Sequence, residues 1–136
     1  MLNIKILLFL FLLFNAGISF SQKQQKENKI QRQILSSATH MPEFPGGVAA
    51  LKTFLVKSLK YPKKAYNDSL EGKVLARIVV EPNGDITNIE IIESLSPECD
   101  KETIRVIKKM PDWNPARQNG IPVACYYELP IIFRMK

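Results

Sequence analysis

The sequence is poor in the residues that catalysis and metal binding require. Its 136 residues include one histidine, His40, and two cysteines, Cys99 and Cys125. A Cys–His nucleophile needs a base held within hydrogen-bond reach of the thiol, and no histidine accompanies either cysteine in an expected helix or strand. Two cysteines with a single histidine outside the folded part do not form a zinc site. No Gly-rich phosphate loop or paired carboxylate motif is present, so we predict no enzyme, no metal and no cofactor.

An excess of basic residues is largely confined to the N-terminal part. The whole chain has 19 basic and 13 acidic residues, whereas residues 41–136 hold 14 of the basic and 12 of the acidic ones. Nucleic-acid binding requires a basic face, and this near balance does not support one. We therefore predict no nucleic-acid partner.

The only long apolar run lies at the N-terminus. Ile6–Phe14 is uninterrupted and follows Lys5, but it is shorter than the roughly 20 residues of a membrane-spanning helix. Small residues at Ser19 and Ser21 suit a signal peptidase. Residues 1–21 are therefore expected to be a cleaved secretory signal peptide, with an uncleaved membrane anchor as the alternative.

The next segment, residues 22–40, is rich in glutamine and lysine and has few large apolar residues. Such a segment cannot bury enough surface to offset the entropy lost on ordering. We expect a flexible linker here and a single folded domain in residues 41–136.

The domain opens with a helical pattern and continues with a hairpin. Apolar residues at helical spacing precede Pro62, which ends the helix: Leu51, Phe54, Leu55 and Leu59. Residues 73–80 then alternate as in a half-buried strand, and Pro82–Asp85 has turn chemistry. In the return strand Ile86 is out of phase with Ile89, and either a β-bulge or a position of Ile86 in the turn would account for this.

A second helix and a last strand complete the domain. Ser96 is the expected N-cap of the helix, and Pro111 ends it. A loop with Asn119 and Gly120 leads to a final strand from about Val123 to Phe133. The order predicts an α+β fold, a two-layer sandwich in which two helices cover one face of a three-stranded antiparallel sheet.

In the residues that begin, end and connect these elements, the sequence resembles the TonB C-terminal domain family over about Pro42–Phe133. The matching positions are Tyr61, Pro62, Ala65, Gly72, Val74, Gly84, Pro111, Trp113, Pro115, Asn119, Gly120, Pro122 and Val123. The resemblance implies an α-β-β-α-β fold, the same order of elements as predicted above. It also implies a periplasmic domain that takes part in energy-coupled transport and binds the TonB box of TonB-dependent outer-membrane transporters.

The resemblance places the last strand at the sheet edge, where an extended partner can add as a further strand. The peptide-binding residues it implies are Val123, Ala124, Cys125, Tyr126, Tyr127, Glu128 and Leu129. Pro130 lacks an N–H and is expected to end or bend the ladder. Trp113, framed by Pro111 and Pro115, is expected to cover one end of the core.

Two other functions use the same features. A structural module of a cell-envelope assembly would dimerise or dock through the same edge strand. A short transducer would keep its N-terminus as an inner-membrane anchor and engage the proton-channel complex there. A coil of about 20 residues spans only about 25 Å, which is less than the width of the periplasm. We therefore expect a chain that binds TonB-box segments but does not transmit force to the transporter.

The strand order of the family also bears on the cysteines. The first strand would lie in the middle, so Cys99 and Cys125 would sit at opposite ends of the sheet. A disulfide requires Cα atoms within about 7 Å. We therefore expect two separate thiols.

Overall fold

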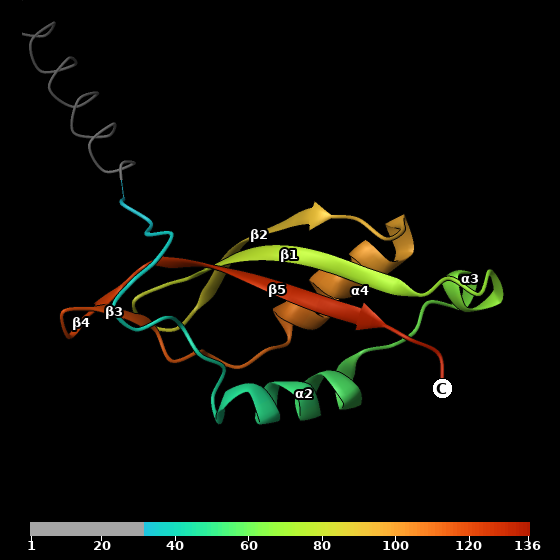
Figure 1. Cartoon of the computed structure of the whole chain (residues 1–136), viewed down its shortest axis with the longest axis horizontal. Helices are drawn as coiled ribbons and strands as arrows, with labels where there is room; N and C mark the ends of the chain where they lie inside the picture. Colours follow the sequence, from blue (N-terminus) through green and yellow to red (C-terminus); the bar gives the residue numbers. More distant parts are fainter. Residues whose placement is uncertain (1–31) are drawn as a thin grey trace, which may run out of the picture. The chain divides into compact units, whose positions relative to one another are not determined.

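The computed structural model describes residues 32–136, of which 34–136 form one compact unit. The expected signal peptide and residues 22–31 of the expected linker lie outside the described residues. Within residues 32–136 no helix is long and apolar enough to cross a membrane. The elements in chain order (Figure 1) are α2 (Gly47–Ser58), α3 (Lys63–Asn67), β1 (Gly72–Val80), β2 (Ile86–Glu93), α4 (Pro97–Lys108), β3 (Ala116–Gln118), β4 (Ile121–Val123) and β5 (Cys125–Phe133).

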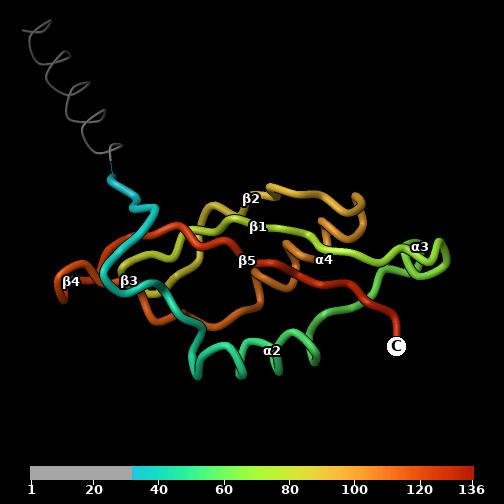
Figure 2. Tube along the Cα trace, viewed as in Figure 1, coloured from blue at the N-terminus to red at the C-terminus, as the bar shows by residue number. Residues whose placement is uncertain are grey.

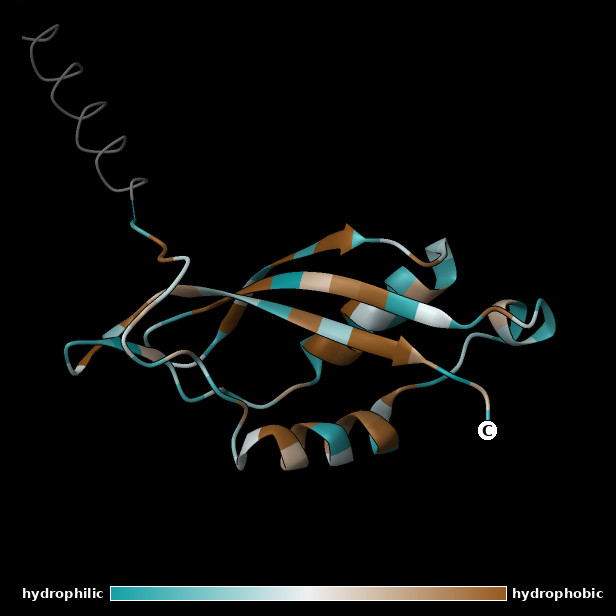
Figure 3. Cartoon of the chain, in the orientation of Figure 1, coloured by the Kyte–Doolittle hydropathy of each residue, from teal (hydrophilic) through white to brown (hydrophobic). Residues whose placement is uncertain are grey.

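The main sheet has three strands in the order β2-β1-β5, and β1 pairs antiparallel with both neighbours. β2 and β5 therefore run in the same direction on opposite sides of β1. This confirms the predicted α+β fold, with β5 as an outer strand. Buried residues alternate with more exposed ones along most of β1 and the second half of β5, as expected for strands with one buried face, and many residues of both strands are hydrophobic (Figure 3).

The core lies between the helices and one face of this sheet. The strands contribute their alternate residues to it: Val74, Ala76, Ile78 and Val80 from β1, and Leu129, Ile131 and Phe133 from β5. α4 adds Val106 and Ile107, and α2 adds Leu51. The Ser96 hydroxyl accepts a hydrogen bond from the Cys99 N–H at 3.1 Å, which confirms the predicted N-cap of α4.

The β1–β2 hairpin contains the predicted turn and a β-bulge, which is one of the two explanations that the sequence left open for Ile86. Gly84 has φ +92°, and a Cβ there would lie 2.3 Å from the Trp113 carbonyl oxygen. Gly84 therefore allows both the turn and the close passage of the Trp113 backbone, whose N–H donates to the Gly84 carbonyl at 2.9 Å. One extra residue of β2 between its pairs with Val79 and Arg77 brings Ile86 and Ile89 onto the same face.

The segment before β5 differs from the prediction of one long last strand. Val123 belongs to β4, which pairs with β3 in a separate two-stranded hairpin, and β5 starts only at Cys125. Asn119 and Gly120 form the two-residue turn of this hairpin, with φ +50° and +82°. Positive φ at both central residues is the requirement of the type I′ turn, for which Asn-Gly is a preferred sequence.

The residues just before α2 also pair with the domain, although the sequence placed 34–40 in a linker. Leu35 forms a parallel bridge with Cys125, His40 an antiparallel bridge with Arg117, and Glu43 one with Asn114. The compact unit therefore starts earlier than Met41.

Both cysteines are buried free thiols, as predicted. Cys99 lies in the core cluster at the start of α4, and Cys125 lies at the start of β5.

Candidate functional site

The outer strand β5 pairs with β1 in one unbroken register. All nine residues of β5, from Cys125 to Phe133, have a partner in β1 from Val80 to Gly72, with no register shift. The backbone N–H groups of a strand point alternately to its two sides. A single outward N–H therefore assigns the direction of all the others.

Leu35 shows which N–H groups of β5 point outward, because it lies on the side of β5 away from β1. Its N–H donates to the Ala124 carbonyl at 3.0 Å, and the Tyr126 N–H donates to its carbonyl at 2.9 Å. Figure 2 shows the segment that contains Leu35 passing the start of β5. The outer edge of β5 is thus already occupied at Ala124–Tyr126.

By the same alternation, the N–H groups of Glu128 and Ile132 point outward, and that of Tyr127 faces β1, where it pairs with Ile78. Pro130 falls at an outward position, so its missing N–H leaves the pairing with β1 intact. Among residues 32–136, only Leu35 pairs with the outer edge of β5. The open backbone groups therefore lie between Tyr126 and Ile132.

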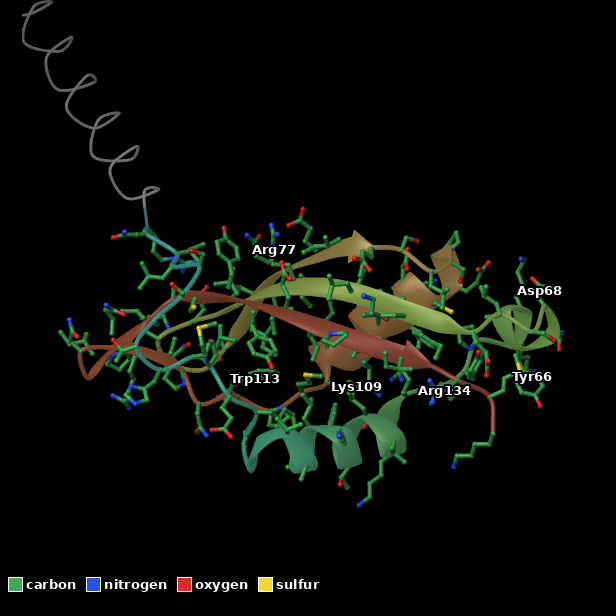
Figure 4. All side chains as sticks on the ribbon, viewed as in Figure 1. Tyr66, Asp68, Arg77, Lys109, Trp113 and Arg134 are labelled. Atoms are coloured by element: carbon green, nitrogen blue, oxygen red, sulfur yellow. The ribbon has the colours of Figure 1, made fainter. Side chains whose placement is uncertain are left out.

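An aromatic cluster supports the middle of β5. The Trp113 ring, labelled in Figure 4, lies 5.0 Å from that of Tyr127 and 5.8 Å from that of Phe44, centroid to centroid, both in edge contacts. Trp113 is only 3% exposed. The ring therefore covers one end of the core, as predicted, and contacts the edge strand directly through Tyr127.

Arg77 joins both outer strands on the sheet face opposite the helices. Its guanidinium lies 3.3 Å from the Glu128 carboxylate on β5 and 3.9 Å from the Glu90 carboxylate on β2. It also lies over the Tyr126 ring, 5.8 Å from the centroid. These exposed contacts orient side chains of β5 without using its outward backbone groups.

The other motif residues have structural positions. The Tyr61 hydroxyl donates to the Leu70 carbonyl, and its ring packs edge-on against Phe133 at 5.7 Å. Pro62 is the N-cap of α3, and Gly72 begins β1. Pro111 and Pro115 lie on either side of Trp113 between α4 and β3. These motif residues therefore define where the helices and strands next to β5 begin and end.

Cys125 offers no reactive group at the start of β5. It is fully buried, and burial raises the pKa of its thiol. A raised pKa keeps the thiol protonated at neutral pH, and the protonated form is a poor nucleophile.

The structure brings six of the seven residues predicted for the edge to β5 or directly before it. Val123 is the exception, because its pairing with Ala116 places it in the β3–β4 hairpin. Sequence reasoning missed Leu35, which covers the first part of the edge, and Ile132, which extends the open part beyond Pro130. An isolated bridge such as that of Leu35 has no periodic pattern that would reveal it.

Comparisons with known proteins agree with this fold. The family described as Gram-negative bacterial TonB protein C-terminal matches residues 57–135. The chain belongs to this TonB C-terminal family. A search of curated proteins found no match.

Two solution structures of the Helicobacter pylori TonB C-terminal domain are similar to the chain. One is 17% identical, with 65% of this chain and 80% of that one covered and a TM-score of 0.46. The other is 16% identical, with 64% and 91% covered and a TM-score of 0.45. Likenesses of this size carry no argument about function.

Family membership identifies the general process. The TonB C-terminal family takes part in TonB-type transport energy transduction, is not a family of enzymes, and is associated with outer-membrane transporters. TonB C-terminal domains lie in the periplasm of Gram-negative bacteria.

Proposed function

We propose that this protein is a periplasmic domain that binds extended TonB-box segments of outer-membrane transporters by β-strand addition to β5. The observation that carries the proposal is the regular outer edge of β5, whose outward N–H groups at Glu128 and Ile132 have no strand partner within residues 32–136. Main-chain hydrogen bonds to such an edge give affinity with little demand on the partner's sequence.

The pairing of Leu35 supports the same mode of binding. An extended residue already exchanges two backbone hydrogen bonds with β5 at Ala124 and Tyr126. A partner strand would continue this arrangement along Tyr126–Ile132. The proposed site is therefore shifted toward the C-terminus compared with the stretch 123–129 expected from sequence.

A titration with peptides from transporter N-termini, followed by backbone amide NMR, tests this proposal. We expect the largest shifts at Glu128 and Ile132, and no shifts along β2 or around the exposed Val56 of α2. Shifts confined to the helices would contradict strand addition at β5.

A pair of variants at Glu128 separates the backbone from the side chain. Glu128→Pro removes an outward N–H, and the loss of one hydrogen bond of about 0.5–1.5 kcal/mol is expected to weaken peptide binding up to about tenfold. Glu128→Gln keeps the N–H and removes only the exposed ion pair with Arg77, so its affinity is expected to stay close to that of the native protein.

The second candidate is a module that dimerises or docks into an envelope assembly through this edge. The Leu35 pairing favours it equally, because a strand from another copy of the chain fits the same backbone groups. Light scattering over a range of protein concentrations distinguishes the two. A stable dimer that is unaffected by transporter peptides would favour the module.

One further partner rests on residues outside those described. Engagement of an inner-membrane proton-channel complex requires an uncleaved N-terminal anchor. Cell fractionation tests this requirement, because a mature protein released from the membrane fraction and starting after Ser21 excludes the anchor.

A further inference from the structure

A groove opens beside the middle of β5. It has a volume of about 300 Å³ and is lined mainly by apolar side chains: Met41, Phe44, Val48, Leu51, Trp113 and Tyr127. Two of these residues are unusually exposed for their type, Met41 at 45% and Val48 at 63%. In Figure 1, α2, which supplies Val48 and Leu51, lies on the side of β5 away from β1.

Tyr127 links this groove to the edge strand. Its side chain points to the helix side of the sheet, where it packs against Trp113 and the core cluster. Residues directly opposite each other on adjacent strands have their side chains on the same face, with Cβ atoms about 5 Å apart. A residue of an added strand that lies opposite Tyr127 would therefore point toward the groove.

The position of Leu35 restricts where the added strand lies. Leu35 sits opposite Cys125 and uses the backbone groups of Ala124 and Tyr126. A partner strand that leaves this pairing intact starts near Tyr127 and continues toward Ile132. The residue beside the groove is therefore at one end of the paired stretch, its first residue in a strand parallel to β5 and its last in an antiparallel one.

We propose that the groove is a specificity pocket that takes one large apolar side chain, aromatic or branched aliphatic, from the segment added to β5. This inference rests on the proposed strand addition and adds a sequence preference to it. The apolar walls favour such a side chain because its burial removes apolar surface from water. The exposed Glu43 at the rim disfavours an acidic one.

A substitution scan of the peptide tests the pocket. The transporter peptide that binds most tightly is remade with Phe, Ala or Glu at each successive position, and the dissociation constants are measured by calorimetry. Burial of a large apolar side chain favours binding, so in this open groove we expect Phe to bind roughly tenfold more tightly than Ala at a single position. Glu at that position is expected to bind more weakly than Ala.

A matched pair of variants on α2 locates the effect. Val48→Lys places a charge at the groove, whereas Val56→Lys changes an equally apolar residue, 77% exposed, that does not line it. The lysine in Val48→Lys replaces an apolar wall of the groove with a positive charge. We therefore expect the advantage of Phe over Ala to fall below about threefold, and Glu to gain affinity relative to Ala. Val56→Lys is expected to retain the native preference.

Each outcome has a distinct meaning. If no peptide shifts the amides of β5, the proposed strand addition is wrong. If peptides bind to β5 but Phe, Ala and Glu are equivalent at every position, the pocket alone is wrong. A preference that survives Val48→Lys, or that is lost equally in Val56→Lys, also overturns the pocket.

Discussion

The two outer strands of the sheet pair with the same central strand but present different edges. β5 pairs with β1 without interruption, whereas the pairing of β2 with β1 has two register shifts, between Leu75 and Ala76 and between Arg77 and Val79. β2 also has exposed carboxylates at Glu90 and Glu93. Bulges and charges are common protections of a sheet edge against further strands. The fold thus has one irregular, charged edge at β2 and one regular edge at β5, and the regular edge is the one proposed above for a partner strand.

The packing beneath the two strands differs as well. β5 places Leu129, Ile131 and Phe133 in the core, each at most 2% exposed, whereas no residue of β2 is fully buried. A strand that is fixed on its inner face keeps its outward groups in place before a partner arrives. Such preorganisation lowers the ordering cost of binding.

The largest expected effect comes from removing the ring that supports β5. Trp113→Ala is expected to lower the free energy of unfolding by about 3–5 kcal/mol, as for other large-to-small aromatic changes in a core. Chemical denaturation followed by circular dichroism measures it. A loss under about 1 kcal/mol would mean that β5 does not depend on this ring.

Two variants serve as controls for this effect. Trp113→Phe keeps most of the apolar contacts, and the indole Nε1 has no hydrogen-bond acceptor among the described residues, so this change is expected to cost less than Trp113→Ala. Ile89→Ala removes a half-buried side chain beneath β2 and is also expected to cost less. If Ile89→Ala costs as much as Trp113→Ala, the two strands are supported equally and the comparison fails.

Much of the sheet could be predicted because its signals are local. The alternation along β1, the Gly84 turn and the Ser96 N-cap each depend on a few neighbouring residues, and the structure has all three. Even the irregularity of β2 was visible, since Ile86 is out of phase with Ile89. Asn119–Gly120 is an equally local hairpin signal, but the prediction places it only in a loop. The predicted start of the last strand at Val123 is therefore wrong, because Val123 belongs to the β3–β4 hairpin.

The covering of the β5 edge could not be predicted from such signals. Leu35 and Cys125 are far apart in the sequence, and their pairing uses backbone groups that every residue has. The surrounding segment is polar and resembles a linker by composition. The groove is similarly non-local, because its walls come from the residues before α2, from α2, from the Trp113 segment and from β5.

A smaller effect is expected from changing the irregularity of β2. Asn88 lies at the second register shift and has φ +55°, a conformation that costs most residues about 1–2 kcal/mol but that asparagine and glycine tolerate. Asn88→Val is expected to lower the free energy of unfolding by about that amount, and Asn88→Gly is expected to be nearly neutral.

The same variants test whether the bulge protects β2. If Asn88→Val is fully stable, the strand has relaxed into a regular register. Transporter peptides should then also shift amides of β2 in the NMR titration. Shifts that stay at β5 in a variant with a regular β2 would show that the bulge is not what excludes partners.

The smallest effect is expected where β5 is already covered. Leu35→Pro removes the N–H that donates to the Ala124 carbonyl, one hydrogen bond worth about 0.5–1.5 kcal/mol. Hydrogen exchange should report it locally, because the Tyr126 amide, which donates to Leu35, loses protection when the bridge opens. The Leu129 amide faces β1 and should keep its protection, and Leu35→Ala, which retains the backbone N–H, should keep that of Tyr126. Equal protection of Tyr126 in the native protein and in Leu35→Pro would mean that the bridge does not occupy the edge, and the open edge would then begin at Ala124, the residue before β5, rather than after Tyr126.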